Sequence, residues 1–342
     1  NEQPTKSQEI PREYVLAIYE PVPFIQGYIE SSFRLDKHID QQLVNQAEID
    51  ECPGDFNSFG GLKFDLQYDN ESAESKVLRK FDLDCDGKLS GTNCPLELYK
   101  ESRKLFIYWH LFNVICDGNK EHFKYFMVLR SYSIREHRKP GICVIIISAP
   151  GVGKTSVFGS NANGKGIYPL IFDGFYQSIN DPDDLTKHFN EDCRNKFYVV
   201  CEDANPNNHR KNNETLKSVI TEGELSFTPK GVDTSTNVKD HRAFQMHSQR
   251  GDCVKIEEGD RRYFMIYSSD RNTLLAVNEG RCTSEFQQAY NQCLIGCQRN
   301  EALAYEVYKD HMKWEIDINL GFAPVSELKK EQMECNKCAV ER

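Results

Sequence analysis

A glycine-rich turn directly after an apolar run is the feature that most constrains how this chain can fold. The run CVIII covers Cys143–Ile147, and the turn SAPGVGKTS covers residues 148–156. Two glycines, Gly151 and Gly153, let backbone N–H groups turn toward one point, and Lys154 follows at once. A buried strand that leads through such a turn into a helix is the arrangement that holds the phosphates of a nucleotide. The stretch therefore predicts a strand–loop–helix unit that binds a nucleoside triphosphate.

The side chains of this loop have predicted roles. Lys154 would contact the β- and γ-phosphates, and the Thr155 hydroxyl would bind Mg²⁺. Ser148 stands where the usual pattern has its first glycine, and a serine is tolerable at that place. ATP and Mg²⁺ are the expected ligands, and the predicted binding residues are Ser148, Gly151, Gly153, Lys154, Thr155 and Ser156.

A second apolar run ends in two adjacent carboxylates. The stretch KFYVVCEDAN, residues 196–205, reads as a buried strand followed by Glu202 and Asp203. One carboxylate can hold the water shell of Mg²⁺ while the other orients or deprotonates an attacking water. We assign the metal to Glu202 and the base role to Asp203, and the two could be exchanged. Solvated acids at a strand end would be an equally good interpretation without the phosphate loop.

A third signal lies in residues 244–270, where one strand ends at Gln249 and another follows Arg261 and Arg262. An amide at a strand end can sense the γ-phosphate. Exposed arginines can reach the nucleotide of a neighbouring subunit and neutralise charge in the transition state. A pair of ordinary surface arginines is the alternative, and the order of the elements favours the functional interpretation.

Taken in this order, the motifs resemble superfamily 3 helicases of the AAA+ class, and in particular the helicase part of viral, phage and plasmid primase–helicases, including the poxvirus type. The resemblance covers about residues 54 to 270. The stretches that carry it are FNSFGG at 56–61, WHLFNVICDGNKEHFKYFMVLRSYSIREHRKPG at 109–141, KHFNEDCRNKFYVVCED at 187–203, LKSVITEGELSFTPKG at 216–231, and HSQ at 247–249 with GDRRYF at 259–264.

The resemblance implies an α/β ATPase core of AAA+ type with a parallel sheet, preceded and followed by helical regions. It implies a ring, most often of six subunits, with each nucleotide between neighbours. Lys230, on the loop of a predicted hairpin, would then point into the central channel and hold single-stranded nucleic acid. DNA is the expected nucleic acid, and RNA stays open as an alternative. The implied activity is ATP-driven 3′→5′ translocation and unwinding during replication, together with other replication proteins.

Three departures from the family pattern leave alternatives open. Ser148 replaces a glycine, Glu202 stands where aspartate is usual, and Gln249 replaces an asparagine. A nucleotide-binding switch or scaffold without unwinding activity is the main alternative, and a folded but inactive viral copy is another.

The pattern of apolar residues predicts four regions. These are a mixed region over 1–98, a helical segment over 99–142, the ATPase core over 143–275 and a C-terminal helical region over 276–342. Helical spacing predicts one helix over 96–116 and another over 120–136. Strands are predicted at CVIIIS, YPLIFDGF, FYVVCED, AFQMHS and YFMIYS, and further helices at 184–190, 214–221, 283–294 and 300–316.

Composition narrows the class of protein. With 342 residues and a net charge of −10, the chain can form a large core but is not a protein that coats DNA with a uniformly basic surface. It has 13 cysteines without a framework spacing, which favours reduced thiols and an intracellular protein, in host cytoplasm or nucleus if viral. No apolar run reaches the roughly 20 residues of a membrane span, so no membrane partner is expected. The chain opens on Asn1, and we expect it to be part of a longer protein.

Three further patterns have ordinary explanations. Residues 81–93 imitate a calcium-binding loop through Asp82, Asp84 and Asp86, but Asn93 replaces the bidentate glutamate, so a polar turn is the preferred interpretation. The CNKC stretch, Cys335 to Cys338, is half of a zinc motif without an evident second half, although Cys293, Cys297 and His311 lie in the same C-terminal region. Phosphate contacts and solvated faces are equally good interpretations for five basic residues, which are Lys217, Lys230, Lys239, Arg242 and Arg250.

Overall fold

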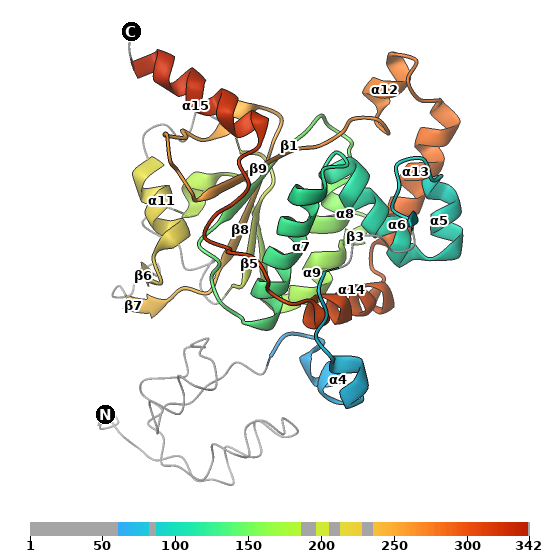
Figure 1. The fold of residues 1–342 in the computed structure, drawn as a ribbon, viewed down its shortest axis with the longest axis horizontal. Helices are drawn as coiled ribbons and strands as arrows, with labels where there is room; N and C mark the ends of the chain where they lie inside the picture. Colours follow the sequence, from blue (N-terminus) through green and yellow to red (C-terminus); the bar gives the residue numbers. More distant parts are fainter. Residues whose placement is uncertain (1–60, 82–86, 186–195, 205–212, 228–234, 341–342) are drawn as a thin grey trace, which may run out of the picture.

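The computed structural model describes residues 61–81, 87–185, 196–204, 213–227 and 235–340 (Figure 1). At its centre lies a five-stranded sheet in the order β4-β5-β8-β1-β9, in which every pair of neighbours is parallel. Its strands are β1 (Cys143–Ile147), β4 (Tyr176–Ile179), β5 (Tyr198–Cys201), β8 (Ala243–Ser248) and β9 (Tyr263–Tyr267). The predicted α/β class with a parallel sheet is thereby confirmed.

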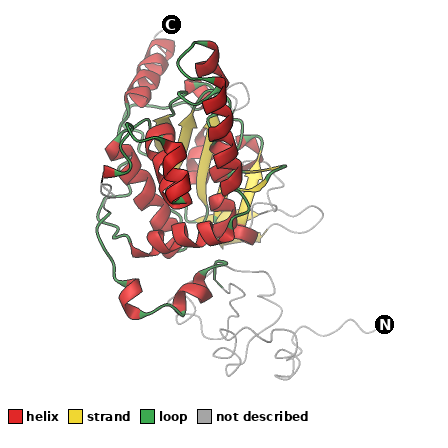
Figure 2. Ribbon diagram, turned by 90° about the vertical axis from the view of Figure 1, so that its right-hand side faces the viewer, coloured by secondary structure: helices red, strands yellow, loops and turns green. Residues whose placement is uncertain are grey.

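Both faces of the sheet are buried, which is why its strands read as continuous apolar runs. Successive side chains of a strand point to opposite faces. In β1, Val144 and Ile146 join one core, while Cys143, Ile145 and Ile147 join the other. Figure 2 shows the strands enclosed between helices.

The larger core lies between the sheet and helices that precede, separate or follow its strands in the sequence. They are α5 (Pro95–Glu101), α6 (Arg103–His110), α7 (Lys120–Arg135), α8 (Lys154–Phe158), α9 (Ile167–Phe172), α13 (Ser284–Cys297) and α14 (Glu301–Lys313). The smaller core forms against α11 (Asn213–Thr221), the segment around the 3₁₀ turn Gly251–Cys253, and α15 (Glu327–Val340). Two short helices lie further out, α4 (Asp65–Asp69) and α12 (Leu274–Asn278).

The prediction of a single helix over 96–116 is wrong, because the helix is interrupted at Ser102. This residue has extended backbone angles, φ −157° and ψ 123°, and its side chain accepts a hydrogen bond from the N–H of Leu105 at 3.4 Å. It therefore ends α5 and caps α6, and a π-helical turn, Leu111–Ile115, follows α6. Helical periodicity persists across such a break, so the pattern alone does not reveal it.

The strand predicted at YPLIFDGF is also wrong. Its first residues lie in α9, and the neighbouring strand β4 begins only at Tyr176. All six residues of α9 are buried, and the helix packs against α14. A short run that is apolar on every side fits a buried helix as well as a buried strand, so periodicity does not separate the two. The predicted helix over 184–190 is described only in part, as the 3₁₀ turn Pro182–Leu185.

The predicted hairpin is confirmed by the antiparallel pair β6 (Glu224–Phe227) and β7 (Ser235–Lys239). Lys230 lies outside the described residues. A buried ion cluster holds the base of the hairpin, because Asp240 accepts hydrogen bonds from Lys139 and from Arg242 Nε at 2.7 Å. Lys139 also donates to the Glu222 carbonyl at 2.7 Å, just before β6. The cluster thus joins both ends of the hairpin to the core.

Other features bear on the predicted class of protein. Eight described cysteines are free thiols, as predicted. None of the helices in the described ranges is long and apolar enough to cross a bilayer. A minor pair of two-residue strands, β2 (Ser160–Asn161) and β3 (Gly164–Lys165), follows α8. The proposed division into four regions stays a prediction.

The ion cluster at the hairpin base yields a stability prediction. Burial alone would raise the pKa of Asp240, but Arg242 and Lys139 outweigh it and hold the pKa below its ordinary value. Asp240→Asn leaves two buried cations uncompensated, so we expect a loss of about 3–5 kcal/mol in the free energy of unfolding. Urea unfolding followed by circular dichroism measures it.

The matched control is Asp252→Asn, which removes a carboxylate from the exposed ion pair with Arg250 at 2.8 Å. That pair should contribute about 1 kcal/mol or less. Equal losses in the two variants would contradict the structural role of the buried cluster.

Candidate functional site

The carboxyl ends of three neighbouring strands are tied together by hydrogen bonds. The N–H of Ser148, after β1, donates to the carbonyl of Ser248 at 3.0 Å. The hydroxyl of Ser248, at the end of β8, donates to the Ala204 carbonyl at 2.8 Å. The N–H of Ala204, after β5, donates to the His247 carbonyl at 2.8 Å. The glycine-rich loop, the exposed Gln249 and the acidic pair therefore meet at one edge of the sheet.

The loop after β1 has the backbone that its glycines predict. Gly151 and Gly153 adopt φ values of 80° and 95°, a region that favours glycine. Ser148 does not have a positive φ, which explains why a serine is accepted where glycine is usual. The Ser148 hydroxyl is buried and accepts a hydrogen bond from Lys154 Nζ. Serine thus adds a contact that holds the lysine head.

The lysine lies within electrostatic reach of both acids. Burial lowers the pKa of Lys154, while Glu202 and Asp203 raise it, and the net pKa lies below its ordinary value. Asp203 is exposed to solvent, whereas Glu202 is partly buried. The three charged groups that were predicted from separate motifs are therefore brought together.

Glu202 uses only one of its two carboxylate oxygens. Its Oε2 is 3.2 Å from Nδ1 of His247, whereas its Oε1 is buried and has no hydrogen-bond partner. A Cβ placed on Gly159 would lie 2.4 Å from Oε1 and 2.8 Å from Thr155 Cγ2. Only glycine at position 159 lets the carboxylate come this close to α8 and to Thr155.

These residues fit a bound magnesium ion. Mg²⁺ is held in nucleotide sites by one or two protein oxygens together with phosphate oxygens and water. The unpartnered Oε1 of Glu202 beside Thr155 is an oxygen ligand of this kind. Within the described ranges there is no cluster of three or more His, Cys, Asp or Glu side chains suited to a metal, so a cage built only of protein ligands is not found there.

The two arginines lie at the opposite edge of the sheet. Arg262 directly precedes β9, and its carbonyl accepts from the N–H of Cys143, the first residue of β1, at 2.8 Å. The five residues of β1 span about 15 Å, so this edge is far from the phosphate loop. Arg261 is exposed, and Arg262 pairs with Asp260 at 3.2 Å. Neither arginine can reach the phosphate loop of its own chain.

Two of the five basic candidates for nucleic-acid contact are wrong. Lys217 and Arg242 are buried, with 4% and 1% of their surface exposed. Lys217 pairs with Glu214 at 2.8 Å and with Glu257 at 3.0 Å, and Arg242 pairs with Asp240. Charge alone does not distinguish a buried ion pair from a solvated one in a sequence.

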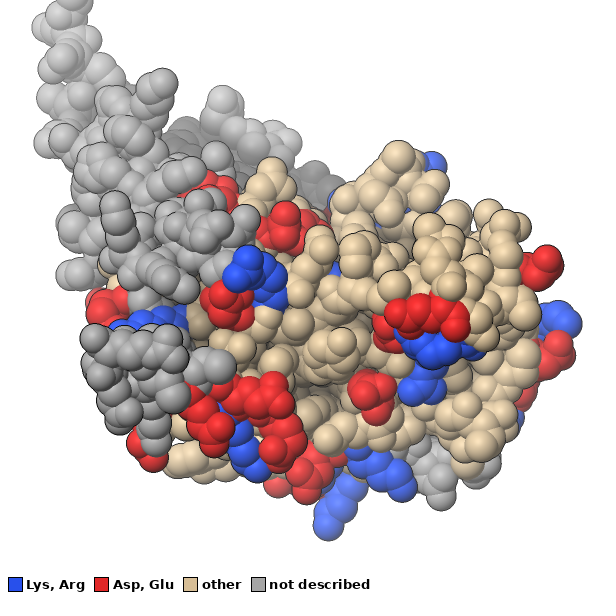
Figure 3. All heavy atoms as spheres, turned by 90° about the horizontal axis from the view of Figure 1, so that it is seen from above, with Lys and Arg blue, Asp and Glu red and all other residues tan. Residues whose placement is uncertain are grey.

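Lys239 and Arg250 remain exposed, although Arg250 is paired with Asp252. On the face drawn in Figure 3, basic side chains lie among acidic ones around a broad uncharged area. That face is therefore not a continuous basic surface.

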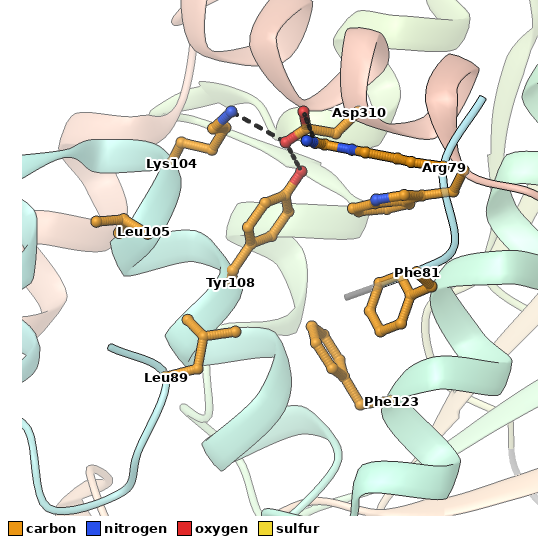
Figure 4. Close-up of a pocket in the computed structure, with 9 residues that line it drawn as sticks. Arg79, Phe81, Leu89, Lys104, Leu105, Tyr108, Phe123 and Asp310 are labelled. Carbon is orange, nitrogen blue, oxygen red and sulfur yellow. Dashed lines mark hydrogen bonds and ion pairs between the residues drawn. The ribbon is translucent and has the colours of Figure 1, made fainter. Parts of the chain in front are cut away.

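A cavity of about 290 Å³ lies elsewhere, between α6, α7 and α14 (Figure 4). Its wall is mostly aromatic and aliphatic. The Asp310 carboxylate at its rim accepts from the Tyr108 hydroxyl at 2.8 Å and pairs with Lys104 at 3.0 Å and Arg79 at 3.4 Å. Its charged side chains thus pair with one another, and none of the predicted site residues lines it.

The metal-like patterns gain no support. Asp82, Asp84 and Asp86 lie outside the described residues, while the Asn93 amide donates to the Gly87 carbonyl at 3.0 Å, as expected for a polar turn. His311, one possible zinc partner, contacts Ser131 at 2.9 Å and Tyr168 at 3.0 Å. Cys335 and Cys338 fall on the C-terminal part of α15, and their side chains lie outside the described part of the structure.

Three polar residues near the two acids were not predicted from the sequence. Gln245 and His247 are buried on β8, and Arg130 is buried on α7. Burial lowers the pKa of His247, although its hydrogen bond to Glu202 raises it. The available signal was a pair of polar residues at alternate positions of an otherwise apolar strand, which places both on one buried face.

Comparisons with known proteins agree with this architecture. The sequence profile of a family of unknown function (DUF5906) matches residues 146–262, from β1 to the residue before β9. No curated protein matches the chain. Apo structures of the C-terminal region of NrS-1 are similar, with a TM-score of 0.53 at 17% identity and of 0.51 at 18% identity. The alignments cover 89% of this chain but only 60% of those chains. At this identity the likeness shows a shared fold.

The close approach at Gly159 gives a prediction for the site. Gly159→Ala places a methyl group against the Glu202 carboxylate, and the local φ of −119° suits alanine, so the effect is steric. Because the carboxylate must move away from Thr155, we expect ATP affinity in Mg²⁺ to fall roughly tenfold. Affinity in EDTA should change less than about twofold. Fluorescent-nucleotide titration measures both.

Gly174→Ala is the matched control, since a Cβ there would meet nothing within 4 Å. Unchanged affinity of Gly159→Ala in Mg²⁺ would show that Glu202 does not act on the bound metal.

Proposed function

We propose that this chain is an ATPase whose site lies at the carboxyl edge of the sheet. The observation that carries the proposal is the convergence of Lys154, Glu202 and Asp203 after strands that are far apart in sequence. A fold-level likeness alone would not support an activity, because one fold serves many functions.

The residues divide the work as follows. Backbone N–H groups of Gly151 and Gly153 and the Lys154 ammonium bind phosphate oxygens. Thr155 and Glu202 would hold Mg²⁺, which would supply positive charge against the charge that develops on the phosphates. Asp203, exposed beside them, orients the attacking water and accepts its proton. Gln249 extends from the neighbouring strand end to sense the γ-phosphate.

The arginines and the hairpin extend the proposal to a motor. The length of β1, about 15 Å, separates Arg261 and Arg262 from their own phosphate loop. We therefore propose that they complete the site of an adjacent subunit. The hairpin is anchored at its base. Lys230 lies between β6 and β7 in the sequence, and in this proposal it contacts a strand in a central channel. We infer a homo-oligomeric ring, of six subunits in the related family, that moves on single-stranded DNA.

In this proposal the chain is the helicase part of a larger replication protein of the primase–helicase type, and it works with other replication proteins. A nucleotide-dependent switch or scaffold is the second candidate. The exposed Gln249 in place of asparagine favours it, since a longer arm can alter the coupling between nucleotide and chemistry.

ATP hydrolysis with and without single-stranded DNA tests the proposal. We expect hydrolysis by the wild type, stimulation by the DNA, and a loss of about 100-fold or more in Lys154→Ala, because a charge-stabilising donor is removed from the phosphates. Release of phosphate measures the rate.

Lys165→Ala is the matched control, because this lysine is exposed and pairs with Asp173 at 2.6 Å. Hydrolysis without stimulation by DNA would favour the switch. Equal rates for Lys154→Ala and the wild type would rule out the phosphate-loop assignment.

A further inference from the structure

A chain of buried polar side chains leads from the interior of the sheet to Glu202. Gln245 and His247 on β8 and Arg130 on α7 have exposed fractions of 1%, 0% and 0%. They lie on the face of the sheet that packs against α7 and α8, where the His247 ring is 5.8 Å from that of Phe158. Buried polar groups carry a desolvation cost that only hydrogen bonds offset, so their arrangement calls for an account.

The orientation of the Gln245 amide follows from its neighbours. Arg130 Nη2 and the Tyr198 hydroxyl both donate to one atom of Gln245, at 2.7 and 2.8 Å. An arginine can only donate, so this atom is the amide oxygen. The amide nitrogen is therefore the atom that faces His247 Nε2 at 2.7 Å.

That orientation fixes the tautomer of His247. Because the amide nitrogen of Gln245 donates, His247 Nε2 must accept and carries no proton. The remaining ring proton is then on Nδ1, which lies 3.2 Å from Glu202 Oε2. An N–H thus points at the carboxylate rather than a lone pair.

Arg130 places a positive charge at one end of this series of hydrogen bonds. Its guanidinium lies over the rings of Tyr198 and Phe126 at 4.7 and 5.3 Å. Across the described residues, no carboxylate forms an ion pair with it. Hydrogen bonds in series polarise one another, so a buried cation at one end strengthens each donor toward the other end. That other end is the anionic Glu202.

We propose that Arg130, Gln245 and His247 are positioning residues for Glu202. They hold its Oε2 and leave Oε1 free and directed toward Thr155, without touching nucleotide themselves. The proposal rests on the proposed function, since it assigns these residues to the metal-binding carboxylate. If these residues only stabilised the fold, replacing them would affect hydrolysis no more than replacing any other buried, hydrogen-bonded side chain.

The tautomer is measured on the wild-type chain, and a variant serves only to assign the signal. In a ¹⁵N-histidine-labelled chain, long-range ¹H–¹⁵N spectra distinguish a protonated Nδ1 from a protonated Nε2, and loss of one of the 9 histidine signals in His247→Asn assigns the residue. We expect protonated Nδ1 and unprotonated Nε2. A protonated Nε2 would overturn the proposal.

Kinetics then separate positioning from packing. His247→Leu should lower kcat for ATP hydrolysis roughly 10- to 100-fold and leave KM for ATP within about twofold, as loss of an outer-shell partner does. His247→Asn, whose amide can replace Nδ1–H, should recover most of kcat. The control is His311→Leu, since this buried imidazole also has both nitrogens bonded, to Ser131 and Tyr168, on helix α14. It should keep kcat within about twofold.

The outcomes are distinct. Equal kcat in His247→Leu and His311→Leu would reject the positioning role while the ATPase stands. No hydrolysis by the wild type would reject the proposed function, and the tautomer measurement would still decide the hydrogen-bond chain. If thermal melting shows that His247→Leu does not fold, Gln245→Met takes its place, with the same loss of kcat expected.

Discussion

Three parallel strands that end side by side determine what this molecule can do. The main-chain and hydroxyl bonds among Ser148, Ser248 and Ala204 leave little freedom in the relative height of the three strand ends. Buried backbone donors and acceptors need partners, and here each strand end supplies them to its neighbour. The loop after β1 and the acids after β5 are thereby fixed relative to one another, although β8 lies between them. Electrostatic coupling of Lys154 with both acids follows from that arrangement.

The two edges of the sheet carry different groups. At the carboxyl edge are the phosphate loop and the two acids. At the opposite edge are Arg261, Arg262 and the base of the hairpin, which the buried ion cluster holds. Strands β1 and β8 run side by side from one edge to the other. In the proposed ring, the arginine edge of one subunit would face the predicted nucleotide site of the next. This assembly is part of the proposal, and the geometry of the single chain supports it.

Much of this site could be predicted from the sequence, because its chemistry is local. Lys154 follows two glycines, and Glu202 follows a run of apolar residues, so each motif marks a strand end in a parallel sheet. The order of the strands is different in kind. Nothing near Cys143 or Tyr198 says that β8 separates their strands, since this depends on packing among distant segments.

The other wrong or missing predictions share one cause. Whether a polar side chain is buried depends on distant segments, and the local sequence pattern does not show it. Lys217 and Arg242 look like surface cations until their carboxylate partners are placed beside them. Arg130 lies in a largely apolar helical stretch and is the strongest sign of a buried polar group, yet its partner on β8, Gln245, is more than one hundred residues away. In the sequence, His247 stood out only as one of two polar residues at alternate positions of the predicted strand AFQMHS.

The most direct test of the central claim is an experimental structure of the chain with ADP and Mg²⁺. The account predicts that the diphosphate lies on the loop formed by residues 148–156, within hydrogen-bonding distance of Lys154, with the metal beside Thr155 and Glu202. A diphosphate bound at another place, or a loop that stays empty at saturating nucleotide, would contradict it.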